Sequence, residues 1–502
     1  MSDNIRPNRP QQLRPVGYEN FQGLDTSRDI ASQDTGRGQV LRTLANAFCD
    51  FRGQICSEPG YNVLTNTGRV SHIRYYAPGE LLWFVRRGDG SDLHSTKGTT
   101  VSKVFSKSAS IASTIYARRA VCVAAGEGAI MFDGNVIDRL PKSDLNHYKP
   151  AFITTVQRRL VIAGVKQSET TVFLSRVDSA DVFPHSEDTG SANVLRAGYI
   201  DIGNMMNTGE TIAGIAPFEQ DRLAIFTQDR CILYVIDPNI DKWTLDPGAN
   251  INVGTLSHRT VVAANTDLLF CSRTGVHSVQ RSRDNGILVS AMTMSDQIKE
   301  LYRSLVASVD KHDDISAVWD KDEAKYHIFF PQKHSEYTIR LTLSLNPTGD
   351  RANPTWSTGN FLKETCADFL GGNLAFGTMA GVVTALQLGD RTGDVYAPFT
   401  ISTPKLWNGA ITETKDAKRL LVQASGKAIL TIKAENEDGE IIWSEVVTVE
   451  DDEDDKSIPT EPLSSHYELK FECRYKAVRF HIEGTAKGDF RMTGLAVYIQ
   501  PK

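Results

Sequence analysis

The stretch that decides the fold is residues 120–137, AVCVAAGEGAIMFDGNVI. It contains two short apolar runs, Ala120–Ala124 and Ala129–Phe132, which are separated by Gly126-Glu-Gly128 and followed by Asp133-Gly134. An Asp-Gly pair favours a tight hairpin, because both central positions of a type I′ turn require positive φ. The stretch therefore predicts a meander of short antiparallel strands.

The same order of polar turn, apolar run, short break and second apolar run returns along the chain. The repeated pairs are Arg159–Ala163 with Thr171–Ser175, Asp221–Phe226 with Cys231–Ile236, Asp267–Cys271 with Gly275–Val279, Tyr326–Phe330 with Tyr337–Leu341, and Asn373–Phe376 with Val382–Leu386. Copies roughly 45 to 65 residues apart are typical of propeller blades with insertions. We therefore expect an all-β protein with a β-propeller over residues 69–400.

The segments before the propeller differ from it. Residues 1–16 contain three prolines and few apolar groups, and they predict a flexible arm. Residues 17–68 are expected to form an entry arm with one short helix. This helix would begin near Asp34, and its apolar face would consist of Val40, Leu41, Leu44 and Phe48.

Two further elements are predicted downstream. Ser295 can cap an amphipathic helix near residues 295–309, inserted in the propeller. Residues 401–502 contain runs in which apolar and charged side chains alternate, as in Tyr467–Arg474. Such alternation marks strands with one buried and one solvated face, which indicates a C-terminal β-sandwich-like domain.

Composition excludes several classes of protein. Hydrophobic residues make up 40% of the chain, charged residues 23%, and the net charge is -6, which argues against a dedicated nucleic-acid binder. The seven cysteines are scattered without a CxxC pair, so we expect buried free thiols. No apolar run approaches the ~18 residues of a membrane span, so no membrane insertion is expected.

No catalytic signature is present in the sequence. The GxSxG, HExxH and P-loop motifs are absent, and the histidines do not pair at metal-ligand spacing. The acidic run Glu450–Asp455 lacks the glycine of a calcium loop and is expected to be a solvated loop, with a cation site or a contact to a basic partner as the alternative. Ser282–Gly286 resembles the core of an Asp-box, which is a structural hairpin turn. We therefore expect a protein that is not an enzyme and has no cofactor.

Three arginine pairs lie beside predicted strands, so they could repeat at similar places on successive blades. Arginine binds phosphate through both charge and its bidentate fork, which makes these side chains candidate contacts for DNA in a channel. Solvated blade loops with local carboxylate partners are the alternative. The candidates are Arg86, Arg87, Arg118, Arg119, Arg158 and Arg159.

Several weak motifs, taken in order, resemble the nozzle (tail hub, or stabilisation) proteins of short-tailed bacteriophages. The resemblance spans roughly residues 17–400. The stretches that carry it are Phe21–Thr26, Ala45–Gly53, Glu58–Gly60, Phe173–Phe183, Asp221–Thr227, Thr274–Val279 and Met294–Lys299.

The resemblance implies a structural virion protein in the tail, made and assembled in the host bacterial cytoplasm. It implies a ring, expected to be a hexamer, at the distal end of the portal and adaptor column. Copies of itself, tail adaptor or connector proteins, and tail fibres or spikes would be its partners. Viral double-stranded DNA would make transient contact, and a net acidic chain would not retard it.

Two other functions stay open at the level of sequence. A tail-associated glycan depolymerase on a propeller scaffold would need two carboxylates that are close in space, and sequence spacing cannot reveal them. A monomeric propeller that binds peptides would expose one face of the ring and would not assemble.

Overall fold

The computed structural model describes residues 13–27, 39–50, 52–88, 90–106, 110–134, 137–139, 144–185, 194–279, 293–332, 338–345, 354–386, 393, 395–407, 412–450, 465–487 and 489–500. These residues fall into two compact units. The propeller unit comprises residues 62–342 and 362–385, and the sandwich unit comprises the described parts of 1–61, 343–361 and 386–502. The sandwich unit thus combines segments from both ends of the chain.

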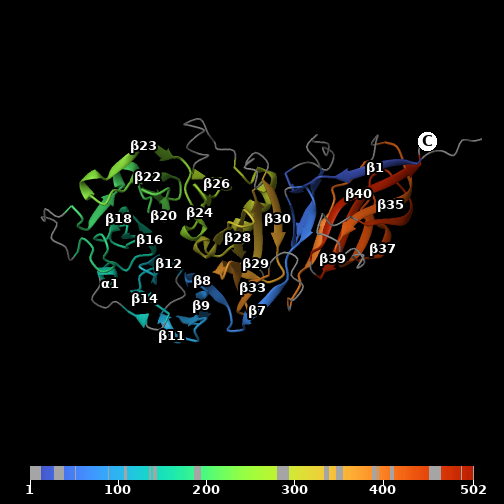
Figure 1. Ribbon diagram of the computed structural model, residues 1–502. Coiled ribbons are helices and arrows are strands. Elements are labelled where there is room, and N and C mark those ends of the chain that lie inside the picture. Colours follow the sequence, from blue (N-terminus) through green and yellow to red (C-terminus); the bar gives the residue numbers. More distant parts are fainter. Residues whose placement is uncertain are drawn as a thin grey trace, which may run out of the picture. The chain divides into compact units, whose positions relative to one another are not determined.

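The described part of the propeller unit contains seven groups of hydrogen-bonded strands, numbered here as blades in chain order. Each is antiparallel where its pairing is described, and Figure 1 shows β8, β12, β16 and β20 on the inner side of their blades. The strands of blades one to three are β8 (Val70–Ala77), β9 (Glu80–Arg87), β10 (Gly90–Ser95) and β11 (Thr100–Phe105); β12 (Ile111–Tyr116), β13 (Arg119–Ala124), β14 (Ala129–Phe132) and β15 (Ile137–Asp138); and β16 (Phe152–Val156), β17 (Arg159–Ala163), β18 (Thr171–Leu174) and β19 (Gly198–Asp201).

The remaining blades follow the same plan. Their strands are β20 (Gly214–Phe218), β21 (Arg222–Phe226), β22 (Cys231–Val235) and β23 (Thr244–Ile251); β24 (Val262–Ala264), β25 (Asp267–Cys271) and β26 (Val276–Ser278); β27 (Ser316–Asp320), β28 (Lys325–Pro331) and β29 (Thr338–Ser344); and β31 (Glu364–Leu370), β32 (Asn373–Thr378), β33 (Val382–Ala385) and β7 (Tyr61–Thr65).

An N-terminal strand closes the propeller. β7 precedes blade one in sequence but is the outermost strand of blade seven, beside β33. This pairing covers an edge of β33 and joins the beginning of the propeller sequence to its end. The propeller predicted from the strand repeats is thereby confirmed, including the meander over residues 120–137.

Aromatic side chains fill the spaces between blades. Tyr76 of blade one meets Phe132 of blade two edge to face, with ring centroids 5.3 Å apart. Phe226 of blade four packs on Phe270 of blade five at 5.0 Å. Such pairs add about 0.5–1.5 kcal/mol to the stabilisation from burial alone, so adjacent blades hold each other in place.

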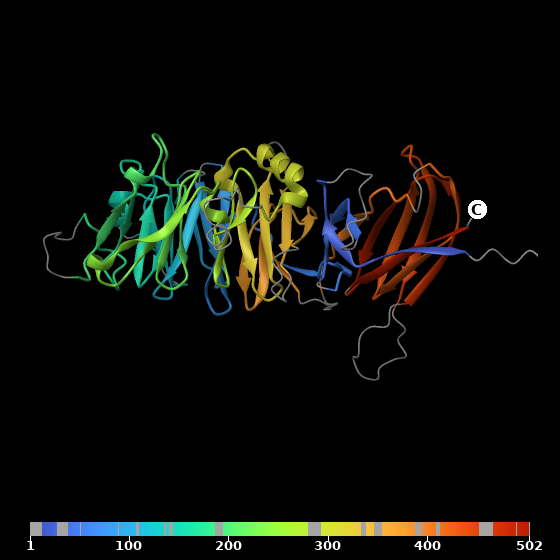
Figure 2. The same cartoon turned by 90° about the horizontal axis from the view of Figure 1, so that it is seen from above.

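The predicted helix near 295–309 is confirmed, although the Ser295 side chain makes no capping hydrogen bond. A 3-10 turn, η5 (Asp296–Ile298), leads into α3 (Lys299–Ser308), which Figure 2 shows in olive at one end of the blade strands. Tyr302 and Leu305 form its buried face, and the Tyr302 hydroxyl donates to the Ser272 carbonyl at 2.6 Å. The other short helices are α1 (Asp144–Tyr148), η1 (Gly203–Met205), η2 (Ile240–Lys242), η3 (His258–Thr260) and η6 (His312–Asp314).

The sandwich unit is built from two larger sheets and a parallel pair. One sheet has the order β38-β35-β40-β6-β5 with β1 added to β40, and the other includes β30-β4-β34-β39-β36-β37. β2 pairs with β3. The strands are β1 (Arg14–Glu19), β2 (Phe21–Leu24), β3 (Gln39–Leu41), β4 (Thr43–Ala45), β5 (Ala47–Cys49), β6 (Ile55–Ser57), β30 (Thr355–Gly359), β34 (Pro398–Ser402), β35 (Lys415–Ser425), β36 (Ala428–Glu435), β37 (Ile441–Val449), β38 (Ser465–Tyr475), β39 (Arg479–Ala486) and β40 (Arg491–Gln500).

The helix predicted after Asp34 is wrong, because residues 39–49 form the three short strands β3, β4 and β5. Asn46, directly after β4, has a φ of 55°, which a right-handed helix does not allow. Its side-chain amide donates to the Pro398 carbonyl at 2.8 Å and accepts from the Asn360 N–H at 3.0 Å. These contacts with distant strands override the helical spacing of the apolar residues. In addition, Arg14–Val16, expected in the flexible arm, lie in β1.

Candidate functional site

Two of the three arginine pairs occupy the same position on neighbouring blades. Arg118 is the second central residue of the β12–β13 turn, and Arg158 has that place in the β16–β17 turn. Both central residues of each turn have positive φ, 47° and 62° in the first and 46° and 61° in the second. These are type I′ hairpins, and both arginine side chains are exposed.

The second arginine of each pair has a different environment. Arg119 is exposed, and its guanidinium lies 3.5 Å from the Met131 sulfur. Arg159 is wholly buried, and its guanidinium stacks on the Trp243 ring at 5.2 Å. The Arg159 guanidinium donates to three backbone carbonyls, those of Ser175 at 2.6 Å, Arg196 at 2.7 Å and Pro238 at 2.7 Å. Arg159 therefore presents no surface to a phosphate.

The third pair lies at the other end of its blade. Arg86 and Arg87 end β9 at the β9–β10 turn, whereas Arg118 and Arg158 lie in turns between the first and second strands of their blades. In an antiparallel meander these turns lie at opposite ends. The Arg87 Nε is 3.2 Å from the Asp92 carboxylate. The three pairs therefore do not form one continuous basic surface.

A channel runs among the inner strands of the propeller, with a cavity volume of about 390 Å³. Every blade contributes lining residues. One from each blade, in chain order, gives Arg74, Ser113, Thr154, Pro217, Val262, Trp319 and Asp368.

Polar side chains tie neighbouring blades together around this channel. Thr365 donates to the Val70 carbonyl at 2.5 Å, and Ser316 donates to the Thr365 carbonyl at 2.9 Å. Thr155 donates to the Ile115 carbonyl at 3.2 Å. Such bonds satisfy backbone carbonyls that the inner strands cannot pair within their own sheets.

The channel also gathers ionisable groups from different blades. His72 and Arg74 come from β8, Arg259 from η3 and Asp368 from β31. The His72 Nε2 is 2.7 Å from the Ser113 hydroxyl. The Arg259 guanidinium donates to the Ser71 carbonyl at 2.8 Å, and the Asp368 carboxylate accepts from the Tyr75 N–H at 3.0 Å.

Burial controls the ionisation of these groups. Desolvation, followed by the positive charges of Arg259 and Arg74, holds the pKa of His72 well below its usual value. Burial also lowers the pKa of His258 to about 4, with Arg259 as the next cause. Burial raises the pKa of Asp368, while Arg74 acts in the opposite direction. The two histidines are therefore neutral at pH 7.

A smaller cavity of about 210 Å³ shares Ala112, His258 and Arg259 with the channel lining. Lys311, Asp313 and Asp314 also line it. Burial, followed by the neighbouring Asp314, raises the pKa of Asp313. The charges here are mixed, as they are in the channel itself.

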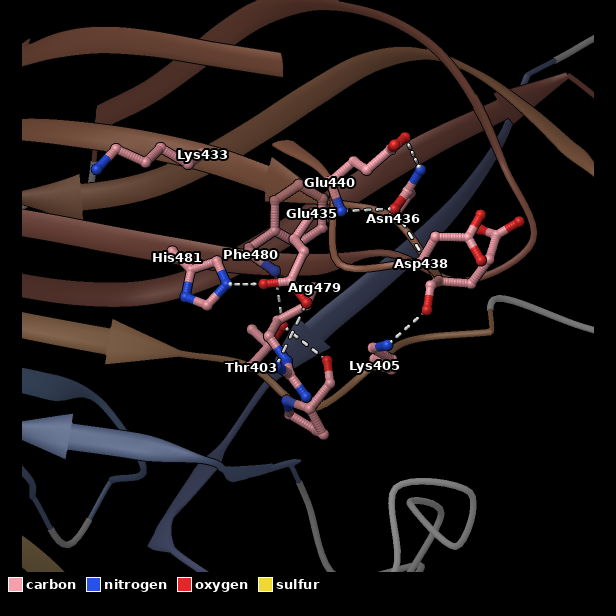
Figure 3. Close-up of polar contacts among 12 residues, drawn as sticks. Thr403, Lys405, Lys433, Glu435, Asn436, Asp438, Glu440, Arg479, Phe480 and His481 are labelled. Atoms are coloured by element: carbon pink, nitrogen blue, oxygen red, sulfur yellow. Dashed lines mark hydrogen bonds and ion pairs between the residues drawn. The ribbon is translucent and has the colours of Figure 1, made fainter. Parts of the chain in front are cut away.

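The sandwich unit contains a second polar cluster on β36 and β39, shown in Figure 3. The Glu435 carboxylate lies between His481, 2.8 Å from its Nε2, and Arg479, 3.5 Å from its Nη1. Lys433 pairs with Glu483 at 3.1 Å. These are cross-strand polar contacts whose partners lie in adjacent strands, so the cluster is a structural ladder.

The structure also tests the predictions made for the cysteines, and it leaves two predicted loop segments undescribed. All seven cysteines are free, and six of them are buried, as predicted. The Asp-box segment Ser282–Gly286 and Asp451–Asp455 of the acidic run lie outside the described residues. Within the described ranges, no group of three or more His, Cys, Asp or Glu residues could hold a metal. No helix in the same ranges is long and apolar enough to cross a membrane.

Comparisons with known proteins add little to this picture. No protein-family model and no curated protein sequence matches the chain. The solved structures similar to it include the extracellular domain of the hybrid two-component system BT3049 from B. thetaiotaomicron (10% identity, TM-score 0.39, 80% of this chain and 56% of that one). Virginiamycin B lyase from Staphylococcus aureus is 11% identical, with a TM-score of 0.36 over 65% of this chain and 97% of that one.

The WD40 domain of SCAP from fission yeast is a third similar structure, with 8% identity and a TM-score of 0.31. The match covers 86% of this chain and 98% of that domain. The functions of these proteins differ widely, and no function is carried over from them to this chain.

The channel residues were missed at the level of sequence. His72 and Arg74 lie in an ordinary strand pattern, and Arg259 follows a segment without any motif. The residues joined by the Arg259–Ser71 hydrogen bond are 188 positions apart. Alternating polar residues in the first strand of a blade would have been the available signal.

Proposed function

We propose that this protein is a structural virion protein that forms the distal ring, or nozzle, of a short bacteriophage tail. It is then a channel for DNA ejection and a docking platform for fibres or spikes, and it contacts the adaptor or connector proteins. The resemblance over residues 17–400 supports this proposal. A propeller combined with a β-rich unit is the architecture that the resemblance implies.

The observation that carries the proposal is an exposed, largely uncharged sheet edge in the sandwich unit. In the described sheet order β37 is the last strand, and Ile441 and Val446 on it are 53% and 63% exposed. Ile429 on the neighbouring β36 is 60% exposed. The exposed side chains of β37 are Ile441, Ser444, Val446 and Thr448. Monomeric proteins usually protect such an edge, so this one suits a self-assembling subunit.

The other sheet of the unit provides the contrast. Its last strand, β38, exposes the charged residues Glu468, Lys470 and Glu472 in alternation. Alternating charge opposes edge-to-edge pairing with another chain. We therefore assign the subunit contact to β37 and not to β38.

In this proposal the DNA conduit lies between protomers and not inside a propeller. A DNA duplex is ~20 Å across, judged from its groove dimensions. A cavity of about 390 Å³ has the size of a site for a small molecule. The exposed Arg118 and Arg158 remain candidate phosphate contacts of a ring, whereas Arg159 does not.

Val446→Lys tests the subunit contact. We expect the variant to fold with a free energy of unfolding within about 0.5 kcal/mol of wild type, because the site is exposed. It should nevertheless fail to form rings, as measured by mass photometry. Lys470→Gln on β38 is the matched control and should assemble normally.

Mass spectrometry of purified tails tests the role itself. We expect this chain in the tail at a fixed copy number relative to the portal, consistent with one closed ring. Tails that lack the chain would contradict the proposal. Release of sugars from host envelope by the purified chain would favour the depolymerase instead.

A further inference from the structure

The propeller channel carries a net positive charge that no feature of the assembly role uses. Among the described residues that line it, Arg74 and Arg259 are cationic and Asp368 is anionic. The lining histidines, His72 and His258, are half-buried and neutral at pH 7, because desolvation and the neighbouring arginines lower their pKa values. Two guanidinium groups against one carboxylate leave a charge of +1 inside a cavity of about 390 Å³.

Arg74 is only weakly satisfied by its neighbours. Its Nη1 is 3.7 Å from the Asp368 carboxylate, which is too far for a hydrogen bond. Its Nε is buried and has no hydrogen-bond partner among the described residues. A buried donor without a partner costs about 1–3 kcal/mol, so a ligand that accepts from it would be stabilised.

Arg259 has donors to spare as well. Its Nη2 donates to the Ser71 carbonyl at 2.8 Å, while a guanidinium carries five N–H donors in all. Arg74, Arg259 and His72 all line the same cavity. The Ser113 hydroxyl, bonded to His72, adds a polar group to the same wall.

We propose that the propeller channel binds a small oxyanion, a carboxylate or monobasic phosphate, between the guanidinium groups of Arg74 and Arg259. Guanidinium forks match planar or tetrahedral oxyanions in geometry and form charge-assisted hydrogen bonds with them. A single negative charge neutralises the channel, and Asp368 disfavours ligands of higher charge. This inference does not rest on the nozzle role, since the site lies within one propeller.

The test is isothermal titration of the full chain with inorganic phosphate and, separately, with acetate. We expect saturable 1:1 binding that sodium chloride at matched ionic strength does not reproduce, and the two probes show which oxyanion is preferred. Arg74→Gln should weaken binding by at least about tenfold, because it removes charge-assisted hydrogen bonds. Arg419→Gln, an exposed arginine of the sandwich unit, is the matched control and should bind as wild type.

Asp368→Asn is a second variant that distinguishes a change in the binding site from misfolding. The asparagine can still accept from the Tyr75 N–H, while the competing negative charge is removed. We expect phosphate to bind several-fold more tightly, a gain that misfolding does not produce. The absence of saturable binding to wild type, equal affinity in Arg74→Gln, or weaker binding in Asp368→Asn would each overturn the proposal.

Discussion

Blades two and three of the propeller carry an arginine pair at the same position but place its second member in opposite environments. The β12–β13 and β16–β17 hairpins have nearly identical turn dihedrals, yet Arg119 is exposed and Arg159 is wholly buried. The difference lies in what surrounds the second pair. The Arg196 and Pro238 carbonyls, from later connections, enclose Arg159. Equivalent positions in a repeat are therefore equivalent in backbone but not in role.

Arg159→Met is the largest expected effect. The variant keeps the apolar stem but leaves the carbonyls of Ser175, Arg196 and Pro238 without their donor. We expect it to lower the free energy of unfolding by about 3 kcal/mol or more, measured by urea denaturation. A loss below about 1 kcal/mol would show that water or another group replaces the guanidinium.

Arg158→Ala should have a smaller effect. Its guanidinium pairs with the Asp178 carboxylate, with Nε 2.7 Å from Oδ1, but both side chains are more than half exposed. Exposed ion pairs contribute less than about 1 kcal/mol, and salt screens them. The difference from wild type should therefore shrink as sodium chloride is raised during denaturation. A loss that does not depend on salt would contradict the surface assignment.

Arg119→Met should have the smallest effect and is the matched control for Arg159→Met. Because Arg119 is exposed, we expect a change within about 0.5 kcal/mol in the same denaturation experiment. A large loss of unfolding free energy in Arg119→Met would contradict the difference drawn between the two blades. It would mean that the strand-start arginine is structural in both.

Sequence alone predicted the elements with a strong local pattern. The paired strand runs and the helix at 299–308 have apolar residues at the spacing that their own secondary structure requires. Residues 39–49 were predicted incorrectly because Val40, Leu41, Leu44 and Phe48 suit a helix as well as short strands. Contacts of Asn46 with Pro398 and Asn360 decide between the two, and these lie more than three hundred positions away.

The sites were harder to predict than the fold. The burial of Arg159 depends on backbone carbonyls 16, 37 and 79 positions away in sequence. No local sequence pattern predicts these contacts. The channel cluster has the same origin, because Arg74, Arg259 and Asp368 converge only when the ring closes. Closure itself depends on β7 taking its place beside β33. Such juxtapositions are properties of the tertiary structure.

Electron microscopy of the purified chain, alone and added to its connector ring, tests the proposed role most directly. We expect closed rings on the connector with a central opening of at least ~20 Å, wide enough for a DNA duplex. Particles that remain monomeric in the presence of the connector would contradict it. That result would not bear on anion binding by the propeller channel, which the titration experiment tests separately.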